Sequence, residues 1–504
     1  MNIREISKER LIEFSEFERQ LEETQDKALA LNMLKAASGS RYPNYYSETL
    51  ERYFINLAEN TKSISSGFGE KAPQEKTYLH VLSAVSLTGG HTRIVERWIS
   101  HSDKDERHSA YLSRQKDPTK IPEELERGVR DSGGKFIRES FRRSIEEKAN
   151  NLREIAMNYD VVILHHNPID PVPLMAFGVK EFTRPVICFN HSGDKFWVGK
   201  YAIDFCIDIE KGQNIITKEV RGIKNTRIIN MPIDKVYQDK TTLEVEDSRK
   251  GLGFSASDKI ITSMASMYKF NSMGSFSFVN NLRSIMSRNE TVKFIGIGIR
   301  ETTDEWKKIV KDFPGRVELV GNVPFSEIKK YLQSTDLYID SLPLHSWLSF
   351  SDAINIGQVP AILLETPIGY LPYLEGSEAI CKSSGELIEK ALAILNSKQK
   401  AEEIKKELSL RLKGRCNKDV FKKEIQDVVS EVKRIKKDDG RFNLNLRKEI
   451  EERAVYFCQS KTMIRSRGIP CFFEIVTAKC FGFKHKTFRL FGINLINWQK
   501  EIDA

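Results

Sequence analysis

Histidines follow several short apolar runs of the sequence, at the points where strands are expected to end. The residues concerned are Gly89, Gly90 and His91 after YLHVLSAVSL, His165 and His166 after DVVIL, and His191 and Asp194 after PVICF. The carboxyl ends of parallel strands meet at one edge of a sheet, so these groups are expected to share one rim. A neutral imidazole beside a substrate hydroxyl serves as a hydrogen-bond partner or as a base. The pattern therefore predicts acid–base chemistry, with a capping or packing role as the alternative for each histidine.

Groups suited to an anion follow two later apolar runs. Lys269 comes after KIITS, and Gly298 closes VKFIGIG. Ser349, Ser351 and Asp352 are expected at the start of a helix. An ammonium group and the free N–H groups of a helix N-terminus both favour a phosphate. The sequence therefore predicts an anion site, with a surface lysine and a capping serine as the structural alternatives.

The stretch 316–365 shows which elements must position these groups. Apolar runs at 317–320, 337–339 and 361–364 alternate with helical spacing at 328–332 and after 352. Strands that alternate with helices imply a parallel sheet. A chain of 504 residues is also longer than one hydrophobic core usually serves. The expected fold is therefore α/β, with two Rossmann-like, doubly wound domains and helical extensions at both ends.

The order of motifs in this stretch resembles a known family. V-x-L-x-G-x-V-P at 317–324, D-L-Y-I-D-S-x-P at 336–343 and S-D-A-I-x-x-G-x-V-P at 351–360 are similar to the nucleotide-sugar half of GT-B glycosyltransferases. The resemblance extends, more weakly, from about residue 78 to about residue 395. It implies a first domain that binds the acceptor and a second domain that binds a nucleotide-diphosphate sugar.

The same resemblance implies roles for single residues. His91 would face the acceptor and act as the base, His191 would face the donor sugar, and Lys269 would bind the donor phosphates. Asp194 is a further candidate base beside His191. The expected donor site is completed by Gly298, Ser349, Ser351 and Asp352, and the acceptor-side loops by Gly89, Gly90, His165 and His166. No metal and no cofactor are expected, because the lysine supplies the positive charge that a leaving diphosphate needs.

A D-x-D pattern at Asp103 and Asp105 is the one sequence feature that suggests a metal. It lies in a charged loop after a helix and does not close a buried strand. Metal binding at these carboxylates is therefore not expected.

Changes in composition along the sequence suggest where the domains divide. The expected parts are a helical extension at 1–76, the acceptor domain at 77–238, the nucleotide-sugar domain at 239–398, a helical crossover at 399–440 and a basic, aromatic tail at 441–504. Between 461 and 489 the tail has seven basic residues and one acidic residue, interleaved with phenylalanines. This pattern is typical of a segment that binds an anionic membrane surface or a polyanion, and packing of the aromatic rings is the alternative.

The overall charge and the termini limit the remaining classes. Lysine and arginine number 79 against 70 acidic residues, and this mixture argues against a nucleic-acid-binding protein. The N-terminus lacks a secretory pattern, and no apolar run approaches the roughly 20 residues of a membrane span. The expected location is the cytoplasm, where the tail would hold the protein at the inner face of the membrane.

Together these features predict a metal-independent glycosyltransferase of the bacterial surface-polysaccharide type. It would move a sugar from a nucleotide-diphosphate donor to a hydroxyl of a glycan, lipid-linked or protein acceptor. Two alternatives stay open. A nucleotide-sugar epimerase of the same fold would need no acceptor, and a non-catalytic protein would bind a polyanion or a membrane surface through the tail.

Overall fold

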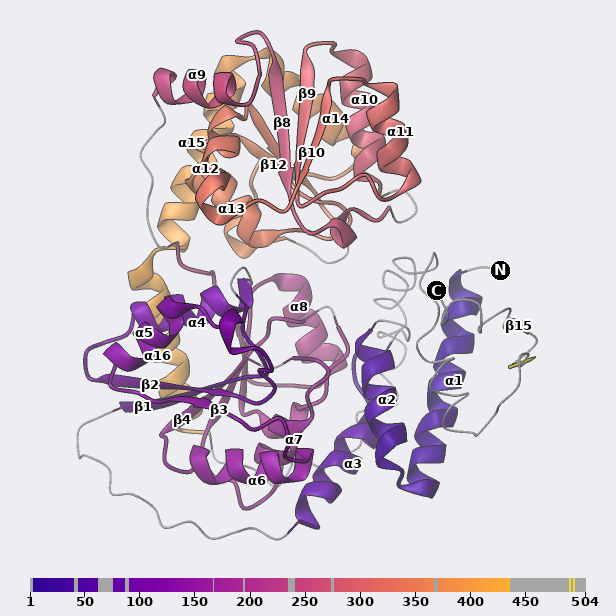
Figure 1. Ribbon diagram of the computed structural model, residues 1–504, viewed down its shortest axis with the longest axis vertical. Coiled ribbons are helices and arrows are strands. Elements are labelled where there is room, and N and C mark those ends of the chain that lie inside the picture. Colours follow the sequence, from indigo (N-terminus) through magenta and orange to yellow (C-terminus); the bar gives the residue numbers. More distant parts are fainter. Residues whose placement is uncertain are drawn as a thin grey trace.

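Two parallel β-sheets with helices packed on their faces form the two halves of the protein (Figure 1). The computed structural model describes residues 3–39, 44–61, 76–86, 90–165, 167–193, 195–233, 241–272, 276–366 and 370–435, together with the pairs 489–490 and 493–494. Within these residues, no helix combines the length and the apolar character that a membrane crossing requires.

The first sheet has its seven strands in the order β3-β2-β1-β4-β5-β6-β7, and all of them are parallel. The strands are β1 (Lys76–Leu82), β2 (Glu106–Leu112), β3 (Phe136–Arg138), β4 (Val161–His165), β5 (Val186–Phe189), β6 (Phe205–Asp208) and β7 (Thr226–Ile228). The central strands are almost entirely buried, as expected for a sheet covered on both faces. The strand expected at 78–87 starts earlier and already ends at Leu82.

Helices at the N-terminus and after the strands cover this sheet. They are α1 (Ile3–Thr24), α2 (Lys27–Ser38), α3 (Glu48–Glu59), α4 (Gly90–Ser100), α5 (Glu123–Asp131), α6 (Ile145–Ala156), α7 (Val172–Phe177) and α8 (Lys211–Ile215). Shorter turns are η1 (Pro118–Lys120), η2 (Lys200–Ala202) and η3 (Ile216–Val220). Phe14, Leu34 and Phe54 of the N-terminal helices share one apolar core with Leu79 and Val162 of the sheet. Burial of this core therefore fixes the helical extension onto the first sheet.

The second sheet has its six strands in the order β10-β9-β8-β11-β12-β13, again all parallel. The strands are β8 (Lys259–Met264), β9 (Val292–Ile297), β10 (Val317–Gly321), β11 (Leu337–Ile339), β12 (Ala361–Leu364) and β13 (Ile380–Cys381). The helices are α9 (Thr242–Gly251), α10 (Phe278–Arg288), α11 (Asp304–Asp312), α12 (Phe325–Ser334), α13 (Trp347–Asn355) and α14 (Ser384–Asn396), with the turns η4 (Met267–Phe270) and η5 (Pro372–Leu374).

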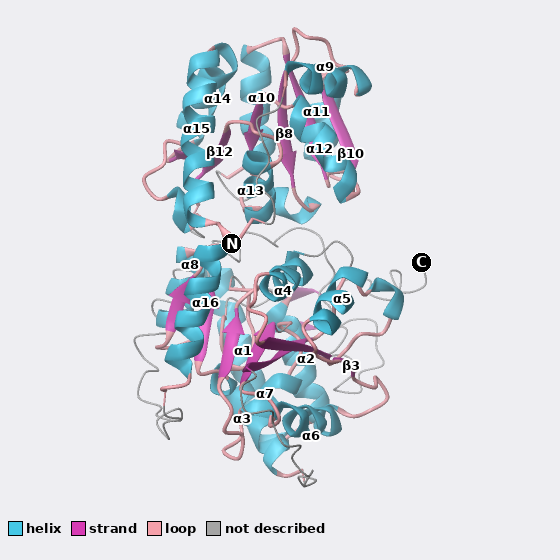
Figure 2. Cartoon of the chain, turned by 90° about the vertical axis from the view of Figure 1, so that its left-hand side faces the viewer, coloured by secondary structure: helices cyan, strands magenta, loops and turns pink. Residues whose placement is uncertain are grey.

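Two C-terminal helices connect the halves. Ile404 and Leu408 of α15 (Lys398–Arg415) belong to the core of the second sheet, whereas Phe421 and Val428 of α16 (Lys418–Val432) pack on the first sheet. Figure 2 shows α16 lying along the first domain. The chain crosses back between these helices, where the carbonyl of Cys416 accepts a hydrogen bond from the N–H of Ile233 at 2.8 Å. Beyond α16, the structure describes only β14 (Arg489–Leu490) and β15 (Ile493–Asn494), so the rest of the predicted basic tail lies outside the described residues.

The strand order of each sheet reverses once, between β1 and β4 in the first sheet and between β8 and β11 in the second. Ligands of doubly wound folds bind beside such a reversal, at the carboxyl ends of the strands. The expected fold class, with two doubly wound domains and helical extensions, is confirmed. The two reversals are therefore the places to look for a site.

Candidate functional site

Three imidazoles gather at the carboxyl edge of the first sheet. His91 lies in the first turn of α4, His165 ends β4, and His191 follows β5. Each of the three offers a ring nitrogen that lies within 4.8 Å of those of the other two. The rings of His91 and His191 meet edge to face, with their centroids 4.2 Å apart. The structure thus brings together three of the histidines that the sequence placed on one rim.

Starting at this rim, four imidazoles form a continuous series of hydrogen bonds, which we call the histidine chain. His191 Nε2 lies 2.9 Å from His165 Nδ1, and His165 Nε2 lies 3.1 Å from His80 Nδ1. His80 Nε2 lies 2.9 Å from His108 Nδ1. His80 and His108 come from β1 and β2, and the three inner rings are fully buried. The histidine chain therefore runs from the rim into the sheet.

Sequence reasoning missed His80 and His108. The available signal was an imidazole inside the apolar run YLHVL and another in the stretch RHSAYL. Buried polar side chains need partners, so each histidine predicts a neighbour without identifying it. The pairing β2-β1-β4 supplies that neighbour, because it sets these strands side by side.

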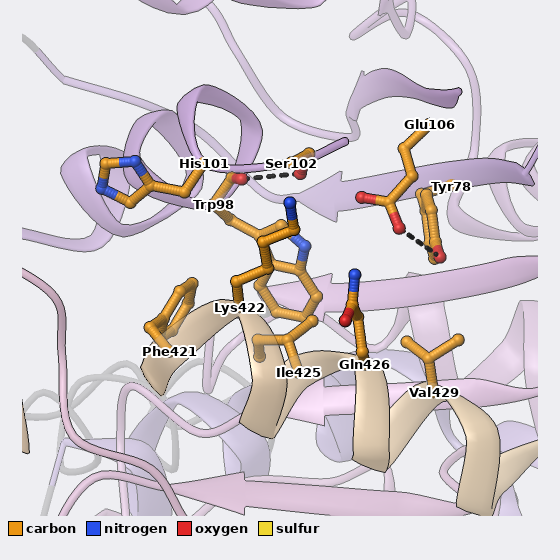
Figure 3. A pocket seen from close by; sticks show the side chains of 10 residues that line it. All are labelled: Tyr78, Trp98, His101, Ser102, Glu106, Phe421, Lys422, Ile425, Gln426 and Val429. Carbon is orange, nitrogen blue, oxygen red and sulfur yellow. Dashed lines mark hydrogen bonds between the residues drawn. The ribbon is translucent and has the colours of Figure 1, made fainter. Parts of the chain in front are cut away.

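The inner end of the histidine chain faces a carboxylate. His108 Nε2 is buried and 3.9 Å from an oxygen of Glu106, which is too far for a hydrogen bond but close enough for an electrostatic interaction. Tyr78 donates its hydroxyl to Glu106 at 3.2 Å, and the N–H of Asp103 donates at 3.1 Å. Figure 3 shows Glu106 and Tyr78 at one side of a small hollow that is also lined by Lys422 and Gln426 of α16.

The charge states of these buried groups follow from their surroundings. Burial raises the pKa of Glu106, but His108 and the N–H of Asp103 outweigh this effect, so its pKa lies below the ordinary value. Burial lowers the pKa of His80 well below its usual range, and His108 adds to the shift. At neutral pH, Glu106 is therefore an anion and His80 is neutral.

His91 is held by a different bond. Its Nε2 lies 2.9 Å from the carbonyl oxygen of His165, and a carbonyl can only accept, so Nε2 carries the hydrogen. The neutral ring then has its lone pair on Nδ1. Because His91 is in the first turn of α4, the helix dipole opposes a positive charge on this ring.

The three rim histidines are also the one group in the described part of the protein whose atoms are spaced to hold a metal ion. The hydrogen bond between His165 Nδ1 and His191 Nε2 uses one nitrogen of each ring, so a metal on both atoms would replace that bond. The expectation of a metal-free site stays a prediction.

The two carboxylates of the D-x-D pattern have protein partners. Asp103 pairs with Lys422 of α16 and accepts a hydrogen bond from Gln426 at 2.8 Å, and Asp105 pairs with Lys76 at 3.1 Å. The two bonds of Asp103 attach α16 to the loop before β2.

In the second domain, Lys269 lies beside the loop that leads into α13. Its Nζ donates to the carbonyl oxygen of His345 at 2.6 Å. His345 Nδ1 lies 3.2 Å from the carboxylate of Asp340, which also accepts the N–H of Ser346 at 3.2 Å. Asp340 and His345 are buried. Sequence reasoning missed this pair, although an acid that closes a strand and a histidine five residues later were visible.

The expected start of the helix after β11 was wrong. The helix begins at Trp347 and not at Asp352, because Asp340 holds the preceding loop through the N–H of Ser346, the N-cap residue. Ser349 is therefore in the first turn, whereas Ser351 and Asp352 lie further inside the helix. Ser351 shares a hydrogen bond of 3.0 Å with the hydroxyl of Tyr373. Of the three, Ser349 alone keeps the expected place beside the free N–H groups.

Gly298 allows two backbone segments of the second domain to approach closely. It has a φ of +79°, and a Cβ at this position would lie 2.3 Å from the carbonyl oxygen of Ala265. The structure therefore gives this glycine a scaffolding role at the carboxyl edge, next to the turn that carries Lys269.

We expect Gly298→Ala to lower the free energy of unfolding by more than the roughly 1–2 kcal/mol that a left-handed conformation costs. Gly253→Ala is a matched control, because Gly253 has a φ of +76° and open space around its Cβ position. Chemical denaturation of both variants checks this. Equal losses would show that the contact with Ala265 relaxes without cost.

Other predicted site residues are not described. Gly89, His166 and Asp194 lie outside the described residues, and Gly90 is the first residue of α4. In Figure 1, α4 and α8 lie at the edge of the first domain that faces the second, and α13 lies on the opposing edge. The edges that carry the imidazoles and Lys269 therefore face each other across the two domains.

Solved structures share this architecture. HepE from Anabaena, in complex with UDP and glucose, matches with a TM-score of 0.55 and 13% identity, over 70% of this chain and 99% of that chain. An O-GlcNAc transferase mutant from Thermobaculum terrenum matches with a TM-score of 0.52 and 13% identity, over 85% of this chain and 81% of that chain. A glycosyltransferase from Rickettsia africae matches with a TM-score of 0.53 and 13% identity, over 72% of this chain and 100% of that chain. No protein-family model and no curated protein matches the sequence. The protein thus has the two-domain GT-B fold that the motifs predicted.

Proposed function

We propose that this protein is a glycosyltransferase that moves a sugar from a nucleotide-diphosphate sugar to an acceptor hydroxyl. The observation that carries the proposal is the arrangement of the two facing edges, with imidazoles on the first domain and Lys269 beside the start of α13 on the second. The shared fold supports it, since HepE was solved with UDP and with UDP-glucose. The donor binds in the second domain and the acceptor in the first.

The proposed reaction needs a cation near the diphosphate and a base near the acceptor. Lys269 and the N–H groups at the start of α13 stabilise the charge that develops on the leaving diphosphate. A rim histidine accepts the proton of the acceptor hydroxyl as that oxygen bonds to the anomeric carbon. His91 is the base that the resemblance favours, and His191 adjoins it.

The finer assignment is a role in bacterial surface glycan synthesis, with a glycan, lipid-linked or protein acceptor. The basic and aromatic pattern between 461 and 489 supports attachment of a cytoplasmic enzyme to an anionic membrane surface. Sedimentation of the protein with anionic and with neutral vesicles tests this attachment separately from catalysis.

Incubation with a panel of nucleotide sugars, followed by nuclear magnetic resonance, tests the activity. Slow hydrolysis of one donor to sugar and nucleoside diphosphate supports a transferase. Conversion of one nucleotide sugar into another identifies an epimerase instead. If no donor binds or reacts, the proposal of a transferase is wrong.

We expect chelation to leave turnover nearly unchanged, because Lys269 supplies positive charge without a metal. Activity is measured with and without EDTA after extensive dialysis. Loss of activity in EDTA that Mn²⁺ or Zn²⁺ restores would contradict metal independence and would point to the three rim histidines as ligands.

A further inference from the structure

We propose that the histidine chain fixes His191 as the base of the reaction, with Glu106 anchoring its inner end. The inference rests on the proposed function, because it assigns the group that takes the acceptor proton. It moves the base from His91, which the sequence favoured, to the neighbouring ring. His165, His80, His108 and Glu106 act through His191 and are positioning residues.

The direction of the hydrogen bonds follows from Glu106. Its anionic carboxylate faces His108 Nε2, so a hydrogen on that nitrogen is favoured and a lone pair there would be repelled. A neutral His108 then has its lone pair on Nδ1, which accepts from His80 Nε2, and His80 Nδ1 accepts from His165 Nε2. In the last bond, His165 Nδ1 accepts from His191 Nε2. Each neutral ring of the histidine chain therefore carries its hydrogen on Nε2, which places the lone pair of His191 on Nδ1.

The electrostatics favour His191 over His91 as the group that becomes positive. Protonated His191 donates into the other imidazoles of the histidine chain, whose inner end faces an anion, and hydrogen bonds in series strengthen one another. Protonated His91 would instead face the positive end of the α4 dipole. A base must hold the proton at the transition state, so stabilisation of the cation favours His191.

The chemical step is balanced as follows. The acceptor oxygen forms a bond to the anomeric carbon while the bond from that carbon to the diphosphate oxygen breaks. The hydroxyl proton passes to His191 Nδ1, and the bonding electrons of the broken bond leave with the nucleoside diphosphate. The resulting positive charge is shared along the histidine chain toward Glu106, and His191 returns the proton to solvent after the product departs.

The first test measures tautomers in the intact protein without any substrate. Protein labelled with ¹⁵N-histidine shows for each ring which nitrogen is protonated, and single histidine substitutions assign the signals. We expect Nε2–H on His191, His165, His80 and His108 at pH 8. Nδ1–H on His191 would overturn the proposal, whether or not the enzyme activity has been found. The tautomer measurement can therefore contradict this proposal without contradicting the proposed glycosyltransferase activity.

The second test interrupts the histidine chain with His80→Phe, and Val81→Ala is the matched control. Val81 is buried in the same strand and belongs to the core on the opposite face, so its truncation lowers stability without touching an imidazole. We expect His80→Phe to lower kcat by roughly 10- to 10²-fold, a part of the contribution of a general base, with unchanged donor affinity. The ¹⁵N signals of His165 and His191 should also change. Equal kcat in the two variants would overturn the proposal. If His80→Phe does not fold, the tautomers measured in the wild-type protein still test the proposal.

Discussion

His191→Ala is expected to lower kcat by about 10²- to 10⁴-fold, the usual contribution of a general base. Donor affinity should remain nearly normal, because the donor binds in the other domain. Stability should fall by about 1–3 kcal/mol, since buried His165 loses the hydrogen-bond partner of its Nδ1. Steady-state kinetics, calorimetric titration of the nucleotide and chemical denaturation measure the three effects on the same preparation.

His91→Ala provides the comparison. Its ring touches His191 and bonds the carbonyl of His165, so its loss should disturb acceptor placement and affect KM for the acceptor more than kcat. A loss of about 10²-fold or more in kcat for His91→Ala, with near-normal kcat for His191→Ala, would return the role of base to His91. Near-normal kcat in both variants would exclude both histidines as the base.

Lys269→Ala is expected to give the second large effect. Removing one positive group that stabilises developing charge typically costs about 10²- to 10³-fold in kcat, and donor affinity should weaken as well. Lys269 also donates to the carbonyl of His345, so part of the effect arises from a looser loop before α13. Calorimetry with the nucleoside diphosphate and kinetics with the sugar donor separate binding from turnover.

Lys330→Ala is the matched control for this substitution. Lys330 donates to the carbonyl of Gly251 at 3.1 Å, but it lies on the exposed surface of α12. The Lys330→Ala substitution therefore removes a lysine–carbonyl hydrogen bond and a positive charge at a position outside the proposed site. Unchanged donor affinity in Lys269→Ala, at an unchanged melting temperature, would remove Lys269 from the site.

The sequence by itself predicted the fold class and the edge of each sheet that carries polar groups. The length of apolar runs such as 161–164 and 361–364 favours buried strands, and helical spacing separates these runs. Parallel strands then place His91, His165 and His191 at one edge, because their carboxyl ends all point the same way. The motifs between 317 and 360 also resembled the GT-B fold that the structure confirms.

The start of α13 was not predictable from local signals. Ser346 is the N-cap residue of α13, but its side chain makes no capping bond. Its N–H instead donates to the carboxylate of Asp340 in the preceding loop. Propensity and spacing therefore placed the helix too late, and Ser351 and Asp352 were assigned to its first turn. Local signals did not predict a role for Asp340 or His345 either, because the interaction between their side chains forms only in the folded loop.

The sequence determined that imidazoles occur at the ends of strands, whereas the tertiary structure alone decided which of them are connected. His80 and His108 are far from His165 and His191 in the sequence, and only the pairing β2-β1-β4-β5 sets their rings at hydrogen-bond distance. A single strand shows which residues alternate between its faces but not its neighbours. Because the acidity of an imidazole depends on those neighbours, the choice between His91 and His191 became possible only once the sheet was assembled.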